Sequence, residues 1–388
     1  MKLKVLDFKE WMKKIMAKKE FFDHQSDLTA SKILIYRQYI SSYLAKVLMQ
    51  YGSCFIADFF CGCGKNGQKD GSPLVLLDIV KKMLDNSILK KKQPNAKIVI
   101  VFSDKNKILC NDLAEYLQKL SIPKQIKILG PYCESFSYIK KGVAEAFNKV
   151  KVPKFFFLDP FTYSDVGIDD VKGFMDLPKA EVLLFLPTFH SYRFAKCDDV
   201  PEALKNFLED FTERGRSNYT DINDFNESIR QKLLKYIDLK YVRVVGLDDG
   251  ARKNALFYLT KHVKGMLQMN KLVWKYTDDG VSMKAKRNNS LTLFDFSPFS
   301  KHFNKMKKYL KNYIIEKKRL TNVEIIDFVT QIGFTTKYTN VILKEMKSKG
   351  LISVKYKKSN KKRGFYVADE HWNEELATII FQGGRNGD

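Results

Sequence analysis

This sequence of 388 residues lacks several motifs that would place it in a common enzyme class. It has no H-E-x-x-H motif, no Walker lysine and no Ser/His/Asp order, so no zinc protease, P-loop NTPase or triad hydrolase is indicated. Its six cysteines form no C-x-x-C pair, which favours reduced, buried thiols over a disulfide framework or a zinc site. No apolar run reaches the roughly 18 residues of a membrane-spanning helix, and we expect no signal peptide. The sequence therefore predicts a cytoplasmic protein without a metal site or a membrane anchor.

Acidic residues are few compared with basic ones. Lys and Arg number 68 and Asp and Glu number 44, which gives a formal net charge of +24. This excess favours a polyanionic partner, above all DNA or RNA, although a lysine-rich proteome would produce the same balance. An apolar fraction of 45% excludes a mainly disordered chain, and the length allows two domains with separate cores.

Short apolar runs alternate with helical patterns from residue 54 onward, which predicts a parallel α/β sheet of the Rossmann type. The expected parallel strands are Cys54–Asp58, Lys97–Ser103, Gln125–Leu129, Lys154–Leu158 and Glu181–Leu186. Between them we expect helices at 73–92, 106–120, 134–149 and about 168–175. An apolar hairpin follows, at Tyr241–Leu247 and Ala255–His262. Five parallel strands closed by a hairpin are the ordering of class I methyltransferases, in which the last strand inserts antiparallel.

The chain divides into four predicted segments. Residues 1–50 form an N-terminal helical extension, with helices at 5–19 and from Asp27 or Thr29 to about Gln50. Residues 51–276 form the Rossmann-like domain, and the polar segment 277–297 is a linker. In 298–380 we expect helices at 302–317, 321–332 and 336–349, then strands Leu351–Tyr356 and Gly364–Val367 around a basic wing. This outline predicts a winged helix-turn-helix, which serves protein docking as well as nucleic-acid binding.

A glycine loop follows the first predicted strand and reads Asp-x-Phe-x-Gly-x-Gly, with its fixed residues at Asp58, Phe60, Gly62 and Gly64. Glycines at these positions permit positive φ angles and remove the Cβ atoms that would block a ligand. The next helix begins only near Pro73, so the loop does not present a helix N-terminus to a diphosphate as a dinucleotide site does. An acid before the glycines suits a cationic ligand, and S-adenosylmethionine carries an ammonium and a sulfonium. The alternative is an ordinary tight turn.

A second motif ends the fourth predicted strand, at Asp159, Pro160 and Phe161. Enzymes that methylate the exocyclic amines of bases have Asp/Asn-Pro-Pro-Tyr/Phe at this position. The acid and a proline carbonyl accept hydrogen bonds from the amino group, and an aromatic ring stacks on the unstacked base. The sequence therefore predicts a site for the acceptor amine, unless Asp159 merely caps the turn.

Two further residues are candidates for cofactor binding. Asp104 ends the second predicted strand, where such folds place a carboxylate that holds ribose hydroxyls, although it lies 40 residues after Gly64. Tyr132 or Cys133, after the third strand, could line an adenine pocket, and a simple helix cap is equally consistent with these residues.

These residues together resemble the three-Cys-motif partner proteins (TcmP), bacterial proteins with a methyltransferase-like fold. The resemblance covers about residues 25–276 and rests on Lys32 through Tyr39, Ile56–Gly64, Asp70–Pro73, Asp159–Phe161, Tyr258–His262 and Trp274–Lys275. Phe59, Cys61 and Thr162 stand where the family usually has Gly, Ala and Gly. The resemblance implies a protein partner that carries a three-cysteine motif and is similar to radical-SAM proteins.

Three hypotheses follow from the sequence. The first is an S-adenosylmethionine-dependent methyltransferase that acts on nucleic acid at a base amine. The second is a non-catalytic protein that binds the cofactor or presents nucleic acid to a separate enzyme. The third is a winged-helix transcription factor with an inert first domain.

Overall fold

The computed structural model describes residues 27–197, 199–277, 279–284, 297–357 and 364–383. The chain divides into two compact units, and each is described by itself. The first comprises Met1–Lys261 with Met283–Lys286, and the second comprises His262–Ser282 with Arg287–Asp388. The helix predicted at 5–19 lies outside the described residues.

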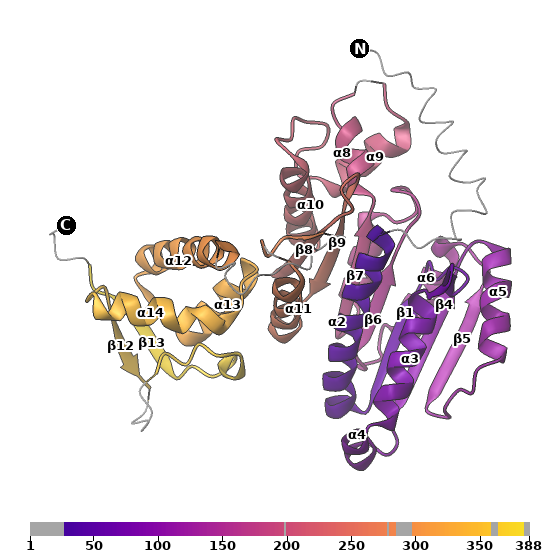
Figure 1. Cartoon of the computed structure of the whole chain (residues 1–388), viewed down its shortest axis with the longest axis horizontal. Coiled ribbons are helices and arrows are strands. Elements are labelled where there is room, and N and C mark those ends of the chain that lie inside the picture. The colour runs from indigo at the N-terminus through magenta and orange to yellow at the C-terminus, as the bar shows by residue number, and fades with distance from the viewer. Residues whose placement is uncertain (1–26, 198, 278, 285–296, 358–363, 384–388) are drawn as a thin grey trace. The chain divides into compact units, whose positions relative to one another are not determined.

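A mostly parallel sheet forms the centre of the first unit (Figure 1). Its strands lie in the order β10-β8-β9-β7-β6-β1-β4-β5. Their bounds are β1 (Ser53–Asp58), β4 (Lys97–Ser103), β5 (Ile126–Tyr132), β6 (Lys154–Leu158), β7 (Ala180–Leu186), β8 (Tyr241–Asp248), β9 (Lys253–Thr260) and β10 (Ser282–Lys284). The strands from β5 to β7 pair in parallel, and β9 inserts antiparallel between β7 and β8. This confirms the predicted strand order of a class I methyltransferase-like fold, with the switch point at β1.

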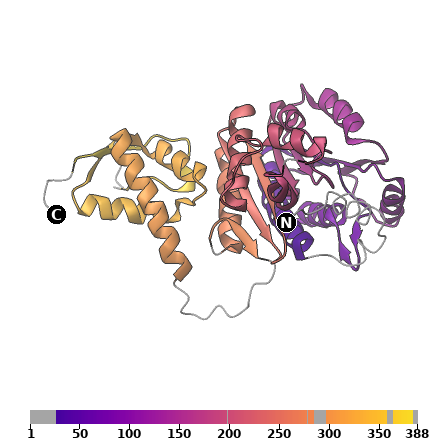
Figure 2. The same cartoon turned by 90° about the horizontal axis from the view of Figure 1, so that it is seen from above.

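Helices cover both faces of this sheet (Figure 2). They are α2 (Asp27–Tyr51), α3 (Ser72–Asp85), α4 (Ser87–Lys92), α5 (Lys107–Gln118), α6 (Phe136–Phe147), α7 (Ile168–Asp176), α8 (Thr188–Phe194), α9 (Glu202–Phe211) and α10 (Ile222–Tyr236). All five residues of β6 are buried, as expected for a strand covered on both sides. Phe156 faces a core that includes Phe174 of α7, whereas Phe155 and Phe157 face the tyrosines of α2.

The helix predicted at 73–92 is divided in two, which corrects the sequence expectation. Asn86 separates α3 from α4 because its side-chain oxygen accepts hydrogen bonds from the amides of Ile88 and Leu89. This is a typical N-cap arrangement, and it starts a new helix where the pattern indicated a continuous one.

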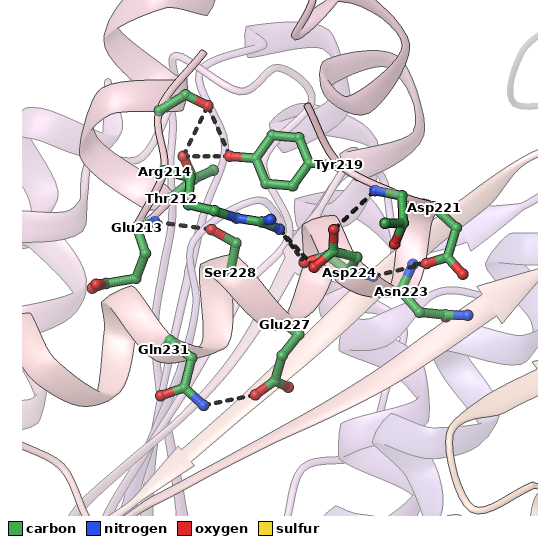
Figure 3. A network of polar contacts seen from close by, with 12 residues as sticks. Thr212, Glu213, Arg214, Tyr219, Asp221, Asn223, Asp224, Glu227, Ser228 and Gln231 are labelled. Carbon is green, nitrogen blue, oxygen red and sulfur yellow. Dashed lines mark hydrogen bonds and ion pairs between the residues drawn. The ribbon is translucent and has the colours of Figure 1, made fainter. Parts of the chain in front are cut away.

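Polar contacts hold together the connection between α9 and α10 (Figure 3). The buried Tyr219 hydroxyl donates to the Gly215 carbonyl at 2.7 Å and lies 3.1 Å from Thr212 Oγ1. Arg214 forms an ion pair with Asp224 at 2.6 Å in the first turn of α10. The insertion between β7 and β8 is thus an ordered part of the first unit.

The second unit contains helices and a small antiparallel sheet of order β11-β13-β12. Its elements are α11 (Val263–Tyr276), α12 (Ser297–Lys317), β11 (Arg319–Thr321), α13 (Asn322–Gln331), α14 (Thr339–Ser348), β12 (Ile352–Tyr356) and β13 (Ala377–Phe381). Short 3-10 helices lie at Thr336–Tyr338 and Asp369–His371.

The second strand of the wing was predicted wrongly. Gly364–Val367 is not a strand, and the partner of β12 is β13, which begins ten residues after Val367 at Ala377. Asn322 explains the difference, since its buried side chain donates to the carbonyls of Tyr366 and Glu374 and thereby holds the intervening segment away from the sheet.

Helix α11 belongs to the second unit, although the sequence placed it in the Rossmann-like domain. Asn270 donates to the carbonyls of Thr330 and Phe334, and the Trp274 indole donates to that of Gly333. The linker at 277–297 stays a prediction, since 285–296 lie outside the described residues. Within the described ranges, no helix is long and apolar enough to cross a bilayer.

Candidate cofactor and acceptor site

Three carboxylates meet at the carboxyl edge of the sheet. Asp58 ends β1, Asp104 directly follows β4 and Asp159 directly follows β6, and these three strands are neighbours. Side chains alternate along a strand, so each of these acids lies on the face that α2 covers. The charges of Asp159 and Asp104 both act on Asp58 and raise its pKa. The two predicted motifs therefore open on one face of the sheet.

The Asp58 carboxyl group is fully buried and forms no hydrogen bond with the described residues. Among the described residues, neither of its oxygens has a partner. Its pKa is raised from the ordinary value to about 7, mainly because the group is buried and also because Asp159 and Asp104 carry like charges nearby. The Ser72 side chain and the Phe60 amide approach and act in the opposite direction, without completing hydrogen-bond geometry. A buried acid in this state is a ready partner for a ligand that brings a cation or an N–H donor.

Helix α2 supplies two side chains that the sequence did not assign to this site. Lys32 forms an ion pair with Asp159 at 2.5 Å, and Tyr36, one turn later, is fully buried close to Asp58. The Tyr36 hydroxyl has no hydrogen-bond partner in the described part of the chain. Burial and the Asp58 charge raise the pKa of Tyr36 well above its usual range, so the phenol stays protonated. Its O–H is a second unpartnered polar group beside Asp58.

The glycine loop has the backbone conformation that its sequence predicts. Gly62 and Gly64 have φ angles of +63° and +81°, which other residues rarely adopt. No heavy atom of the described residues lies within 4 Å of the position that a Cβ at Gly62 would take, so the loop borders open space there. A Cβ at Gly64 would approach Leu113 to 2.9 Å, so Gly64 is required for packing.

Asp104 braces the glycine loop. Its Oδ2 accepts a hydrogen bond from the Gly62 amide at 3.0 Å, and its Oδ1 accepts one from the Asn106 amide at 2.9 Å. Only 1% of the residue is exposed, and burial raises its pKa while the two amides lower it. A contact with ribose hydroxyls would have to use the remaining lone pairs of these oxygens.

The aromatic residues of the two motifs lie in different surroundings. Phe59 packs into the opposite face of the sheet, where its ring stacks on those of Phe156 and Phe174. Phe59 therefore fills the core on the face of the sheet opposite to α2. Phe60 is also buried, against Phe136.

Phe161 and Tyr132 are accessible at the carboxyl edge. Phe161 is 46% exposed and follows the buried Pro160, and Tyr132, at the end of β5, is 41% exposed. The Tyr132 carbonyl accepts a hydrogen bond from the Asp104 amide at 3.1 Å, which places it next to the glycine-loop brace. Both rings are free to stack on a flat ligand or a base.

These residues fit S-adenosylmethionine on grounds that the structure itself provides. An acid that is buried and unpartnered among the described residues ends β1, and four residues later comes Gly62, where an added Cβ would meet no described atom within 4 Å. Helix α3, whose N-cap Gly71 provides no side-chain hydrogen bond, begins at Ser72, which lies close to Asp58. The arrangement could hold an ammonium group at Asp58 and a flat base at Tyr132. In the described residues no cluster of His, Cys, Asp and Glu could hold a metal ion.

Comparison with known proteins finds only weak similarity to solved structures. No family model matches the chain, and no curated protein matches it. An SAH-bound methyltransferase of Podospora anserina is 12% identical, with 57% of this chain and 78% of that chain covered at a TM-score of 0.28. A SAM-dependent methyltransferase of Methanosarcina mazei is 15% identical, with 53% and 90% covered at a TM-score of 0.28. A small RNA methyltransferase is 13% identical, with 57% and 25% covered at a TM-score of 0.28. The fold assignment rests on the strand order of this chain and not on these matches.

Proposed function

We propose that the first unit binds S-adenosylmethionine and transfers its methyl group to an amine of a nucleic-acid base. The observation that carries the proposal is the buried Asp58, which is unpartnered among the described residues and lies on the same face as Asp159. It precedes by four residues Gly62, where an added Cβ would meet no described atom within 4 Å. The methyltransferase-like strand order supports it, because ligands of open α/β sheets bind outside the carboxyl ends of the strands at the switch point.

Each site residue has a defined task in this proposal. Asp58 holds the ammonium group, Gly62 gives it access, Gly64 keeps the loop packed on Leu113, and Asp104 fixes the loop and contacts the ribose. Asp159 accepts a hydrogen bond from the acceptor amine, and Phe161 stacks on its base. When bound, the cofactor would supply a methyl group on a sulfonium: the N–C bond forms as the C–S bond breaks, the neutral thioether leaves, and the amine proton goes to water. The chain therefore contributes alignment rather than activation of the methyl group.

The first test separates binding from transfer. Asp159→Ala should retain S-adenosylmethionine binding within about threefold of the unsubstituted protein, measured by titration calorimetry. It should lose at least about 100-fold in transfer of tritiated methyl groups to DNA or RNA, because the acceptor amine loses its hydrogen-bond partner. Asp85→Ala, which removes a carboxylate with 78% of its side chain exposed, is the matched control. Near-normal turnover of Asp159→Ala would reject the role of this residue.

For the second unit we propose a winged-helix module that holds the nucleic acid. Its order of helices and strands supports this, and so does its charge, since residues 297–388 contain 19 Lys and Arg against nine Asp and Glu. Around the outer surface of α14 and the preceding turn, Lys337, Lys344 and Lys347 are exposed. Such a surface binds phosphates without reading the sequence.

One observation favours a second candidate function, a non-catalytic protein that binds the cofactor. Lys32 already occupies one oxygen of Asp159, the acid assigned to the acceptor. In that case the chain would serve a separate enzyme, such as a partner with a three-cysteine motif. Tight binding of S-adenosylmethionine without transfer to DNA, RNA or the partner protein would favour this candidate.

A further inference from the structure

The contact between Lys32 and Asp159 joins residues that lie 127 positions apart in the sequence. Both side chains are largely buried, with 11% of Lys32 and 19% of Asp159 exposed. The ammonium group of Lys32 also lies 4.6 Å from the centre of the Phe185 ring, at the end of β7. It is therefore held from two sides, by a carboxylate and by an aromatic face.

This contact makes the two oxygens of the Asp159 carboxylate different in their hydrogen bonding. Oδ2 receives the Lys32 ammonium, while Oδ1 has no hydrogen-bond partner among the described residues. One oxygen can thus accept a single N–H from a ligand. The charge that a free carboxylate would offer to a cation is already matched by Lys32.

We propose that Lys32 determines the acceptor specificity of this site, an inference that rests on the proposed function. The site then accepts an uncharged N–H donor and rejects a cationic amine. A base amine is neutral and planar and needs one acceptor oxygen. A lysine or arginine side chain would bring a second positive charge next to the Lys32 ammonium, in a partly buried place where like charges repel strongly. Lys32 acts through Asp159 and is a positioning residue.

The tests use the full-length protein with tritiated S-adenosylmethionine and two acceptors, a single-stranded oligonucleotide that contains all four bases and a lysine-rich peptide. Lys32→Met removes the charge and keeps most of the apolar stem, and Lys32→Arg keeps the charge. Lys82→Met is the matched control, since it removes an exposed lysine that is ion-paired with Asp78. Because Lys32→Met could leave Asp159 buried without a partner and unfold the protein, the double variant Lys32→Met/Asp159→Asn supplies a neutral site of similar shape.

The wild-type protein should methylate the oligonucleotide and not the peptide. Lys32→Met should reduce kcat for the oligonucleotide at least about tenfold, leave the KM for S-adenosylmethionine unchanged and lower the preference for oligonucleotide over peptide at least about tenfold. Lys32→Arg should restore that preference, and the double variant should show the lowered preference while its thermal unfolding stays close to that of the wild type. Calorimetric affinity for S-adenosylmethionine should be equal in all variants.

The outcomes separate this inference from the function on which it rests. The wild-type protein could methylate the oligonucleotide while Lys32→Met and the double variant keep the same preference. This result would overturn the role of Lys32 and leave the proposed function intact. Wild-type transfer to the peptide in place of the oligonucleotide would overturn the inference and retain a methyltransferase. Absence of transfer to either acceptor would overturn both.

Discussion

At the scale of single residues, the carboxyl group of Asp58 has lost contact with water without gaining a hydrogen bond from the described chain. Such a group costs free energy in the folded protein, which is typical of sites that are completed by a ligand. The β-branched and aromatic neighbours of Asp58 predict a buried strand end, so the sequence indicated its burial. It did not indicate Tyr36, because a tyrosine in a helical apolar pattern is usual in a core.

The raised pKa of Asp58 predicts a specific dependence of stability on pH. The folded protein holds this proton up to about pH 7, whereas an unfolded chain releases it near pH 4, so stability falls as the pH rises between these values. Between pH 5 and pH 8 this group alone should lower the free energy of unfolding by roughly 3 kcal/mol. In Asp58→Asn that part of the pH dependence should be absent, as measured by urea unfolding at the two pH values.

Asp85→Asn is the control for this measurement, because its side chain is 78% exposed. It should show the same pH dependence as the wild type. If Asp58→Asn also lost stability between pH 5 and pH 8 to the same extent as the wild type, Asp58 would not be a protonated, buried group near neutral pH.

At the scale of the elements, the sequence predicted most helices and strands but not the contacts that join them. A helix was predicted from Asp27 or Thr29 to about Gln50, and the structure has α2 at Asp27–Tyr51. The ion pair between Lys32 of α2 and Asp159 joins two segments that are far apart in the sequence. No local pattern in the sequence indicates which charged residues form a pair after folding. For the same reason the glycine loop was predicted from its residues, whereas the hydrogen bond from the Gly62 amide to the Asp104 carboxylate was not.

The second unit shows where a local pattern fails. Gly364–Val367 has the apolar residues of a short strand, yet β13 begins at Ala377. The intervening segment is held by Asn322, a fully buried side chain that donates to two backbone carbonyls and accepts from the amides of Leu376 and Ala377. A single side chain thus replaces the backbone pairing that the pattern indicated.

Replacement of Asn322 should therefore destabilise the second unit strongly. Asn322→Ala leaves several buried backbone groups without partners, and we expect a loss of about 2–5 kcal/mol in its free energy of unfolding. Hydrogen exchange of the full-length protein would measure this as increased exchange of amides in β13 and α13. Asn304→Ala, at an exposed position of α12, should leave exchange unchanged. Equal protection in both variants would show that Asn322 does not hold this segment.

At the scale of the whole molecule, the composition predicted a polyanion partner but not where on the chain such a partner would bind. The excess of basic residues is distributed unevenly, because residues 297–388 hold 19 of the 68 Lys and Arg but only nine of the 44 Asp and Glu. Many lysines of the first unit form ion pairs with nearby acids, as Lys105 does with Asp165 and Lys65 with Asp70. In the second unit Lys307 and Lys349 pair with Glu345, and Lys357 pairs with Glu375. The exposed Lys337, Lys344 and Lys347 form no ion pair with any described residue. A free cation of this kind releases counterions when it contacts a phosphate.

This difference predicts which lysines govern the dependence of nucleic-acid binding on salt. A triple variant with Ala at 337, 344 and 347 should bind a duplex more weakly, and the slope of log K against log salt should become shallower by about 2 to 3, since each phosphate contact contributes about 0.9. Fluorescence anisotropy with the full-length protein between 50 and 200 mM salt would measure both quantities. The matched triple variant carries Ala at Lys91, Lys92 and Lys127, which are exposed lysines of the first unit. Both triples remove the same formal charge, so an effect of net charge alone would change the two slopes equally, whereas contacts from the second unit change only the first.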